Sequence, residues 1–141
     1  MQPDDKGGQE PRLDHIHSDA RGDIYRLLVP PDLEVMLFRC KAGQLRGGHS
    51  HTVPEVVSVL LGAMNYHRIL GGQYNIERTA PGDCRVNLPG QPHMGEFLED
   101  SWVIEWKFGP NAGIGKWETV DYPPLRERVL AYLRLEAEKA P

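Results

Sequence analysis

Short runs of β-forming residues, separated by glycine and proline turns, recur along most of this 141-residue chain. Runs of this kind occupy residues 23–30, 33–40, 55–62, 63–70, 73–79, 84–89 and 101–108. Fifteen glycines and twelve prolines supply the turns between them. Strands this short at this spacing predict an all-β fold, an antiparallel double-sheet barrel of the jelly-roll kind.

The chain divides into three predicted segments. Residues 1–22 are polar and broken by glycine and proline, so we expect a flexible N-terminal tail. Residues 23–122 form the barrel. Residues 123–141 predict one C-terminal helix, because two prolines open it and apolar residues recur at helical spacing. We expect this helix to cap the barrel or to pack in a dimer.

Composition excludes several classes of protein. The net charge is −4 and the basic residues are scattered, so nothing suggests nucleic-acid binding. No apolar run approaches the ~18 residues of a membrane span, and the first residues lack an apolar signal region. The two cysteines, Cys40 and Cys84, form no CxxC pair. We therefore expect a reduced, cytoplasmic protein.

Three residues that are awkward to bury singly lie close together in one β-forming segment. His49 and His51 are two residues apart, so in a strand both side chains point to the same face. Glu55 opens the next run, and alternation sends Val57 and Val59 the same way as Glu55, toward an apolar interior. A glutamate there is costly unless it meets a cation or a hydrogen-bond donor. A metal ion held by two neutral imidazoles meets both needs, and it requires a further ligand.

His93 is the best candidate for that further ligand. It follows a strand and a turn at Pro89 and Gly90, so a neighbouring strand can bring its ring beside the first pair. The alternative is that all three histidines are ordinary surface or core residues. His15 and His17 repeat the spacing of the pair, but no glutamate follows at the matching distance, so we expect them to be solvated.

The spacing of the first segment resembles the first motif of the cupin superfamily. Gly43, His49, His51, Glu55 and Gly62 are separated by five, one, three and six residues, which matches that motif at every position.

The second cupin motif is also visible, in Gly82, Gly90 and His93. The family commonly has a proline before the second glycine and an asparagine after the histidine, where this chain has Leu88 and Phe97. These departures affect the turn and the strand beyond it, and they remove no ligand.

The resemblance covers about residues 23–108 and implies a single-domain cupin. It implies one divalent transition metal ion per chain (Fe, Mn, Ni, Zn, Co or Cu), with His49, His51, Glu55 and His93 as ligands. In some cupins the glutamate does not bind the metal. Glu55 is therefore either a ligand or a catalytic group that orients water or substrate or moves a proton.

Four protein ligands leave two open positions if the metal is octahedral, and these admit dioxygen, water or a bidentate substrate. The resemblance therefore implies a metal-dependent enzyme. The leading hypothesis is a mononuclear dioxygenase that acts on a small dicarbonyl, enolisable or phenolic substrate. Two alternatives stay open: a metal-dependent isomerase, lyase or decarboxylase, and a non-catalytic cupin that binds a small molecule.

Five further residues are candidates for substrate contact. Trp102, Ile104 and Trp106 share one strand face, which we expect to line the pocket because the core of a small barrel is also its pocket wall. Tyr66 and Arg68 alternate with His67, and the alternative for them is an ordinary packed or surface pair. Because exposed strand edges need covering, and cupins dimerise through their outer sheets, we expect a homodimer.

Overall fold

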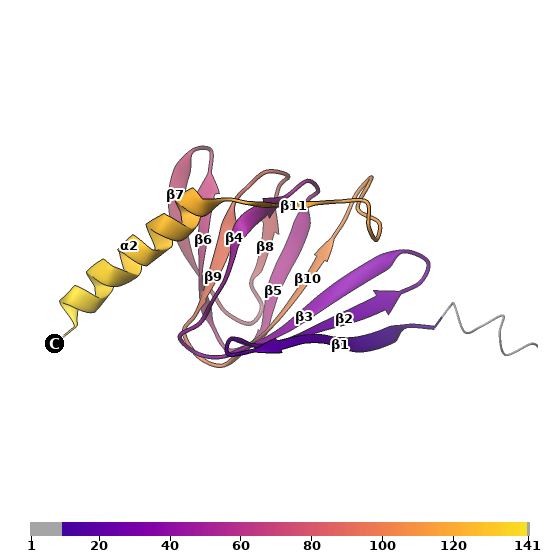
Figure 1. The fold of residues 1–141 in the computed structure, drawn as a ribbon, viewed down its shortest axis with the longest axis horizontal. Coiled ribbons are helices and arrows are strands. Elements are labelled where there is room, and N and C mark those ends of the chain that lie inside the picture. The colour runs from indigo at the N-terminus through magenta and orange to yellow at the C-terminus, as the bar shows by residue number, and fades with distance from the viewer. Residues whose placement is uncertain (1–9, 141) are drawn as a thin grey trace, which may run out of the picture.

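The computed structural model describes residues 10–140 and shows two antiparallel sheets followed by one helix (Figure 1). Its elements are β1 (Arg12–Asp19), β2 (Gly22–Val29), β3 (Leu33–Cys40), β4 (Leu45–His51), β5 (Glu55–Leu61), β6 (Met64–Leu70), β7 (Gln73–Thr79), β8 (Cys84–Asn87), β9 (His93–Phe97), β10 (Ser101–Lys107), β11 (Thr119–Asp121) and α2 (Pro123–Lys139).

The strands form a six-stranded sheet and a five-stranded sheet. The first has the order β1-β2-β3-β10-β5-β8 and the second the order β11-β4-β9-β6-β7. Every strand pair in both sheets is antiparallel. The predicted all-β double-sheet architecture with one C-terminal helix is confirmed.

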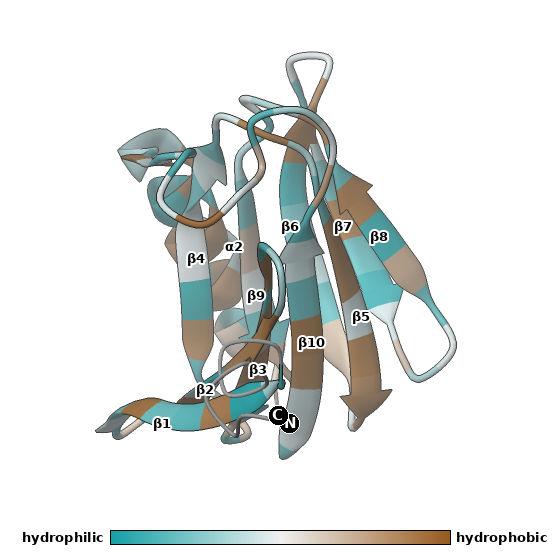
Figure 2. Cartoon of the chain, turned by 90° about the vertical axis from the view of Figure 1, so that its right-hand side faces the viewer, coloured by the Kyte–Doolittle hydropathy of each residue, from teal (hydrophilic) through white to brown (hydrophobic). Residues whose placement is uncertain are grey.

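The hydrophobic core lies between the two sheets. Val57 and Val59 of β5 and Val103 of β10 pack there against Met64 and Phe97 from the other sheet. Strand alternation places these side chains inside the barrel. Figure 2 shows apolar stretches along β5 and β10. The interior end of the barrel beyond this cluster is polar, and it holds the candidate site.

The prediction of a flexible tail over residues 1–22 is wrong for its second half. Arg12–Asp19 form β1, which pairs with β2 at the edge of the six-stranded sheet. The polar sequence of β1 misled the prediction because an edge strand is covered on few sides and needs few apolar residues. The first nine residues lie outside the described part of the chain.

Helix α2 covers the outer face of the five-stranded sheet. Leu125 and Val129 are fully buried against Met94 of β9, with Ile69 and Tyr74 beside them. The helix therefore packs on the outside of the barrel wall, and the alternative that it packs in a dimer stays a prediction. Within residues 10–140, no helix is long and apolar enough to cross a membrane.

Candidate metal centre and cavity

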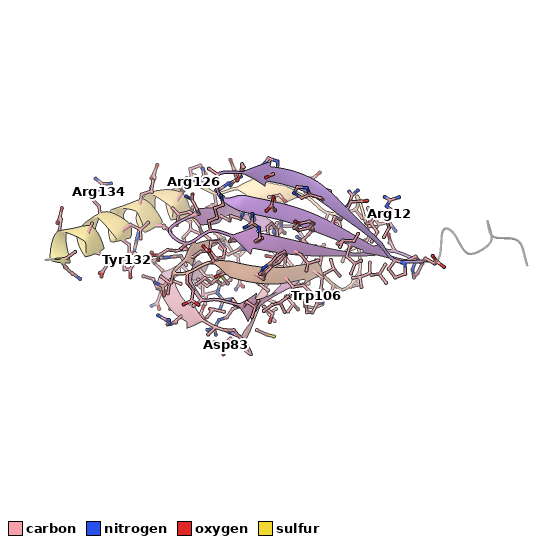
Figure 3. All side chains as sticks on the ribbon, turned by 90° about the horizontal axis from the view of Figure 1, so that it is seen from below. Arg12, Asp83, Trp106, Arg126, Tyr132 and Arg134 are labelled. Atoms are coloured by element: carbon pink, nitrogen blue, oxygen red, sulfur yellow. The ribbon has the colours of Figure 1, made fainter. Side chains whose placement is uncertain are left out.

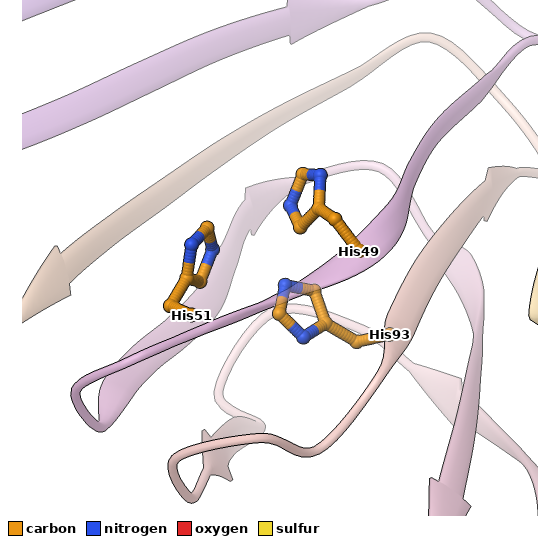
Figure 4. A group of neighbouring side chains, drawn as sticks. All are labelled: His49, His51 and His93. Atoms are coloured by element: carbon orange, nitrogen blue, oxygen red, sulfur yellow. The ribbon is translucent and has the colours of Figure 1, made fainter. Parts of the chain in front are cut away.

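Three histidine rings converge at the polar end of the barrel (Figure 4). His49 and His51 extend from β4 and His93 from β9, where His93 pairs directly with His49 in the strand register. The ring centroids lie 4.7 Å apart for His49 and His51, 4.9 Å for His49 and His93, and 5.1 Å for His51 and His93. The three rings therefore offer nitrogen atoms close enough together to hold one metal ion.

A two-glycine bulge directs these side chains. Gly47 and Gly48 have φ values of +109° and +88°, and the β4–β9 register shifts between Gly47 and His49. Glycine is required at Gly47, since a Cβ there would lie 2.8 Å from the carbonyl oxygen of His93. The bulge changes the strand parity, so Arg46 and His49, three residues apart, both line the interior.

Glu55 reaches the histidines from the facing sheet. Its carboxylate is fully buried, with Oε1 2.9 Å from His93 Nε2 and Oε2 3.3 Å from His51 Nε2. Asn87 Nδ2 donates to Oε1 at 3.0 Å, and Lys107 Nζ lies 3.2 Å from Oε2. Glu55 thus lies against two of the three histidines and is held in place by a hydrogen bond from Asn87 and an ion pair with Lys107.

The hydrogen bonds of two rings fit a metal site. His93 Nδ1 lies 3.0 Å from the backbone carbonyl oxygen of Gln91, which only accepts, so Nδ1 carries the proton in the neutral ring. The lone pair of His93 Nε2 then faces a carboxylate oxygen, an unfavourable contact unless a cation lies between them. Within residues 10–140, His51 Nε2, His93 Nε2 and Glu55 Oε2 are buried without a hydrogen-bond partner. A bound divalent ion would satisfy all three atoms.

The local electrostatics favour the ligand forms of these groups. Burial lowers the pKa of His49 to about 3, and burial also lowers the pKa of His51. Burial alone would raise the pKa of Glu55, but the close contacts with the rings of His51 and His93 and the charge of Lys107 hold that pKa below its ordinary value. Neutral imidazoles and an ionised carboxylate are the forms that bind metal ions.

A small cavity of about 70 Å³, partly open to solvent, adjoins the histidines. His49 and His93 form part of its wall, with the polar side chains of Arg46, Tyr66 and Glu105. The rest of the wall is mostly apolar and is formed by Phe38, Val57, Met64, Phe97 and Val103. A small molecule in this cavity would lie against both the histidine cluster and an apolar surface.

The prediction that Trp102, Ile104 and Trp106 line the cavity is wrong. Strand alternation on β10 turns Val103 and Glu105 inward, and both line the cavity. Trp102 instead stacks on Tyr25 on the outer face of the six-stranded sheet, at 5.8 Å between ring centroids. Trp106, labelled in Figure 3, is two residues after Ile104 and four residues after Trp102 on the same strand. The three side chains therefore share that outer face.

The other two candidates for substrate contact have different positions. Tyr66 lines the cavity, and its hydroxyl lies 2.7 Å from Asn87 Nδ2, so substrate contact stays a prediction for this residue. Arg68 does not line the cavity. Its guanidinium binds Glu77 at 2.7 Å and the backbone carbonyl of Val86 at 2.8 Å, so it supports β8.

His67 lies outside the barrel, as its strand parity predicts, but it is not exposed. Helix α2 covers it, and its ring lies between Tyr74 Oη at 2.6 Å and Glu96 Oε1 at 2.9 Å. His15 and His17 lie far from the cluster in sequence, on β1, and each is about half exposed beside an aspartate, in agreement with the expectation of solvated rings.

Sequence reasoning missed four residues of the site. Lys107 and Glu105 lie inside on β10, and Lys107 Nζ also lies 4.1 Å from the ring centroid of Trp117. Trp117 packs edge-on against His51, and Asn87 holds Glu55. The sequence signal for Glu105 and Lys107 was that these charged residues alternate with the large apolar residues Ile104, Trp106 and Phe108. It was misread because the apolar side of a strand ordinarily faces the interior.

Comparisons with known proteins give the fold. The CapF protein of Staphylococcus aureus, described as a capsular polysaccharide assembling protein, superposes with a TM-score of 0.60 at 23% identity. The match covers 79% of this chain and 32% of that one.

Two further solved structures are similar. One is an uncharacterised double-stranded β-helix protein of Klebsiella pneumoniae, with TM-score 0.59 and 21% identity over 76% of this chain and 90% of that one. The other is a single-substitution variant of the oxalate decarboxylase of Bacillus subtilis, with TM-score 0.56 and 21% identity over 71% and 30% of the respective chains.

This chain has the double-stranded β-helix fold of the cupins, as its two motifs indicated. The chain spans about a third of the length of the CapF chains that it matches. No protein-family model matches the sequence, and no curated protein sequence matches it significantly.

Proposed function

We propose that this protein is a metal-dependent cupin enzyme whose ion is bound by His49, His51 and His93, with Glu55 as a fourth ligand or as an immediate neighbour. The observation that carries the proposal is the set of buried atoms that meet at this point without hydrogen-bond partners within residues 10–140, beside a cavity. Buried polar atoms in native proteins are nearly always satisfied, so their convergence favours a ligand that the atoms share.

A divalent ion at this point would polarise substrate oxygen atoms and stabilise negative charge that develops on them. The chain itself supplies the orientation. Asn87 and Lys107 fix the Glu55 carboxylate, and the hydrogen bonds of His51 Nδ1 to Thr119 Oγ1 at 3.0 Å and of His93 Nδ1 to Gln91 fix both rings.

The leading reaction is oxygenation of a small dicarbonyl, enolisable or phenolic substrate. The support is the cavity wall, where Phe38, Val57, Met64, Phe97 and Val103 surround the approach to the histidines. Such a wall limits water near the reacting atoms and binds a compact, partly apolar substrate.

The test is oxygen uptake by protein reconstituted separately with iron(II), manganese, nickel and zinc, in the presence of diketones, enolisable keto acids and catechols. We expect uptake that depends on both metal and substrate and that is absent from a His51→Ala variant. A His17→Ala variant, altered at an exposed ring on β1, should keep full uptake. Failure of every metal form to consume oxygen during turnover contradicts the oxygenase proposal.

A non-oxidative isomerase, lyase or decarboxylase is the second candidate, and Glu105 favours it. Burial, with the nearby charge of Glu55, raises the pKa of Glu105 to about 7. A carboxyl group on the cavity wall with such a pKa can give or take a proton near neutral pH. Substrate turnover without oxygen uptake, together with a loss of turnover in Glu105→Gln, supports this class.

If ligands bind the metal-loaded protein and no substrate is turned over, the protein is a binding module. Titration of the same compounds, followed by heat release, separates this outcome from the two enzyme classes. The reducing, cytoplasmic location inferred from sequence stays a prediction.

We also propose a homodimer formed through the outer face of the six-stranded sheet. Trp102, Ile104 and Trp106 lie on this face with Tyr25 and Leu37, and they form a broad apolar surface. An apolar surface of this kind is typical of an interface. Light scattering should give the mass of two chains, and a Trp106→Glu variant should give the mass of one.

A further inference from the structure

The side-chain amide of Asn87 is buried between the metal site and the cavity wall, where it contacts three other side chains. Its Nδ2 atom donates hydrogen bonds to Glu55 Oε1 at 3.0 Å and to Tyr66 Oη at 2.7 Å. Its Oδ1 atom accepts a hydrogen bond from Arg68 Nη1 at 3.3 Å. Asn87 is only 2% exposed, so these contacts are made away from water. Both hydrogens of the amide are therefore used within the protein.

Two charged neighbours fix the direction in which this amide points. The guanidinium group of Arg68 only donates hydrogen bonds, and the ionised carboxylate of Glu55 only accepts them. The opposite orientation of Asn87 would place its NH₂ group against Arg68 and its carbonyl oxygen against Glu55, and both contacts would be repulsive. Arg68 is itself held by Glu77 Oε1 at 2.7 Å and by the carbonyl oxygen of Val86 at 2.8 Å. Asn87 thus faces Tyr66 as a donor.

The fixed amide decides the role of the Tyr66 hydroxyl group. Because Tyr66 Oη accepts a hydrogen bond from Asn87, its own hydrogen points in another direction. Among residues 10–140, no group accepts a hydrogen bond from this hydroxyl. Burial and the charge of Glu55 raise the pKa of Tyr66 well above its ordinary value, so the hydroxyl keeps its hydrogen. A buried donor without an acceptor is costly, which favours a ligand that supplies one.

The Tyr66 ring lies beside the histidine cluster. Its centroid is 6.0 Å from that of the His93 ring, and both residues line the same cavity with His49. The guanidinium carbon of Arg68 lies 5.6 Å from the Tyr66 ring centroid, a cation–π contact that helps to hold the ring. A small molecule in this cavity therefore lies against the histidines and against a hydroxyl group that has a hydrogen to donate.

We infer that Tyr66 donates a hydrogen bond to a substrate oxygen atom on which negative charge develops, and that Asn87 is the positioning residue that keeps this hydroxyl a donor. The inference rests on the proposed function, since the metal site brings the substrate oxygen into the cavity. A donor that is fixed in advance stabilises developing charge without reorganising when the substrate reacts. The substrate class that gains most is an enolisable carbonyl compound, because its enolate carries the charge on oxygen.

The test uses acetylacetone, a small diketone that chelates zinc as its enolate, in calorimetric titration of the zinc-loaded protein. Tyr66→Phe removes only the hydroxyl group. We expect the affinity to fall on the order of 10- to 100-fold, as for the loss of a hydrogen bond to a charged group. Tyr122→Phe, altered at a tyrosine that is 37% exposed, should keep the wild-type affinity.

Imidazole is the control ligand for the same titration. Once it binds zinc through one nitrogen atom, it has no charged oxygen atom to accept from Tyr66. It should therefore bind the wild type and Tyr66→Phe equally. Equal affinity of the two proteins for acetylacetone, or an equal loss of affinity for imidazole and acetylacetone, overturns the inference.

A double-mutant cycle tests the positioning role of Asn87. In Asn87→Ala the Tyr66 hydroxyl is released and can turn to the Glu55 carboxylate, so we expect a loss of acetylacetone affinity close to that of Tyr66→Phe. Adding Tyr66→Phe to Asn87→Ala should then cost at most about a further twofold, because the donor is already lost. A residue that only supported the fold would give additive losses, and additive losses contradict the role of Asn87.

Zinc content measured on the same samples separates this inference from the proposed metal site. A wild type that retains no zinc contradicts the proposed function and the inference with it. Retained zinc and normal imidazole binding, with no preference for the Tyr66 hydroxyl in the acetylacetone titration, contradict only the inference.

Discussion

Glu55 is the residue on which the chemistry of the candidate site depends most. It is fully buried, and its two oxygen atoms are shared among His51, His93, Asn87 and Lys107. Strand alternation predicted that Glu55 faces the interior. It did not predict the ammonium of Lys107, which contacts the same carboxylate and competes with a metal ion for it.

Replacing Glu55 by Gln tests how much its charge contributes. Glutamine keeps the shape and an oxygen that accepts from Asn87, but it leaves Lys107 with Glu105 as its only carboxylate within residues 10–140. We expect metal affinity to fall on the order of 10- to 100-fold, as for supporting groups of metal sites. Competition with a fluorescent chelator measures the affinity. Glu138→Gln, on the exposed face of α2, is the control, and wild-type affinity in Glu55→Gln would contradict the assigned role.

Some residues of the site could be predicted from the sequence and others could not. The three histidines and Glu55 were predictable because metal-ligand types recur at fixed spacings in a strand. Arg46 and Lys107 were not, because each reaches the site through tertiary structure alone. Arg46 depends on a bulge, and Lys107 depends on the face that β10 turns inward.

At the scale of elements, the bulge in β4 connects the backbone to the site. Gly47 approaches β9 so closely that a Cβ would lie 2.8 Å from His93 O and 3.0 Å from Met94 Cα. The same close approach places His49 beside His93. Stability and metal binding should therefore fail together when this contact is disturbed.

Gly47→Ala should lower both the free energy of unfolding and the metal content. A side chain at this φ costs about 1–3 kcal/mol in backbone strain, and the clash with β9 adds to that. Gly82→Ala is the matched control, because Gly82 has a φ of +97° with no heavy atom within 4 Å of the added Cβ. Urea unfolding and metal analysis of both variants give the comparison, and identical behaviour would refute the account of the bulge.

Most strands were predictable from their turn residues and β-forming runs, and β3 and β7 begin and end at the predicted residues. Strand β1 was missed and the inward face of β10 was predicted wrongly, each for a physical reason. The edge strand β1 is mostly polar on both faces, so its sequence lacks the alternation of apolar and polar residues that predicts a strand. The apolar face of β10 turned outward, because Glu105 and Lys107 find their charged partners inside the barrel and the outer face of the sheet is apolar.

For the whole molecule, buried histidines make stability depend on pH. Burial lowers the pKa values of His49, His51 and His67, so the unfolded chain takes up protons at these rings first. Above pH about 6.5 these rings are neutral in both the folded and the unfolded chain. The free energy of unfolding falls as the pH drops from that value toward 3. Glu105 has a raised pKa, so its contribution to stability increases as the pH drops from about 7 to 4.5. This one group opposes the effect of three histidines.

We therefore expect the free energy of unfolding of the metal-stripped protein to fall between pH about 7 and about 5. His67→Gln, which keeps hydrogen-bonding capacity beneath helix α2, should reduce the slope. His15→Gln, at a half-exposed ring, should leave it unchanged. Urea unfolding curves across this range measure the slope, and a flat profile for the wild type would be inconsistent with neutral, buried rings.

The central claim is that β4 and β9 bring three histidines together to bind one metal ion. Metal content after stripping, reconstitution with zinc and gel filtration tests it most directly. The account predicts one ion per chain for the wild type and for His15→Ala, and almost none for His93→Ala, with the far-UV spectrum of the barrel preserved in all three. A wild type that holds no zinc, or a folded His93→Ala that keeps a full ion, would contradict it.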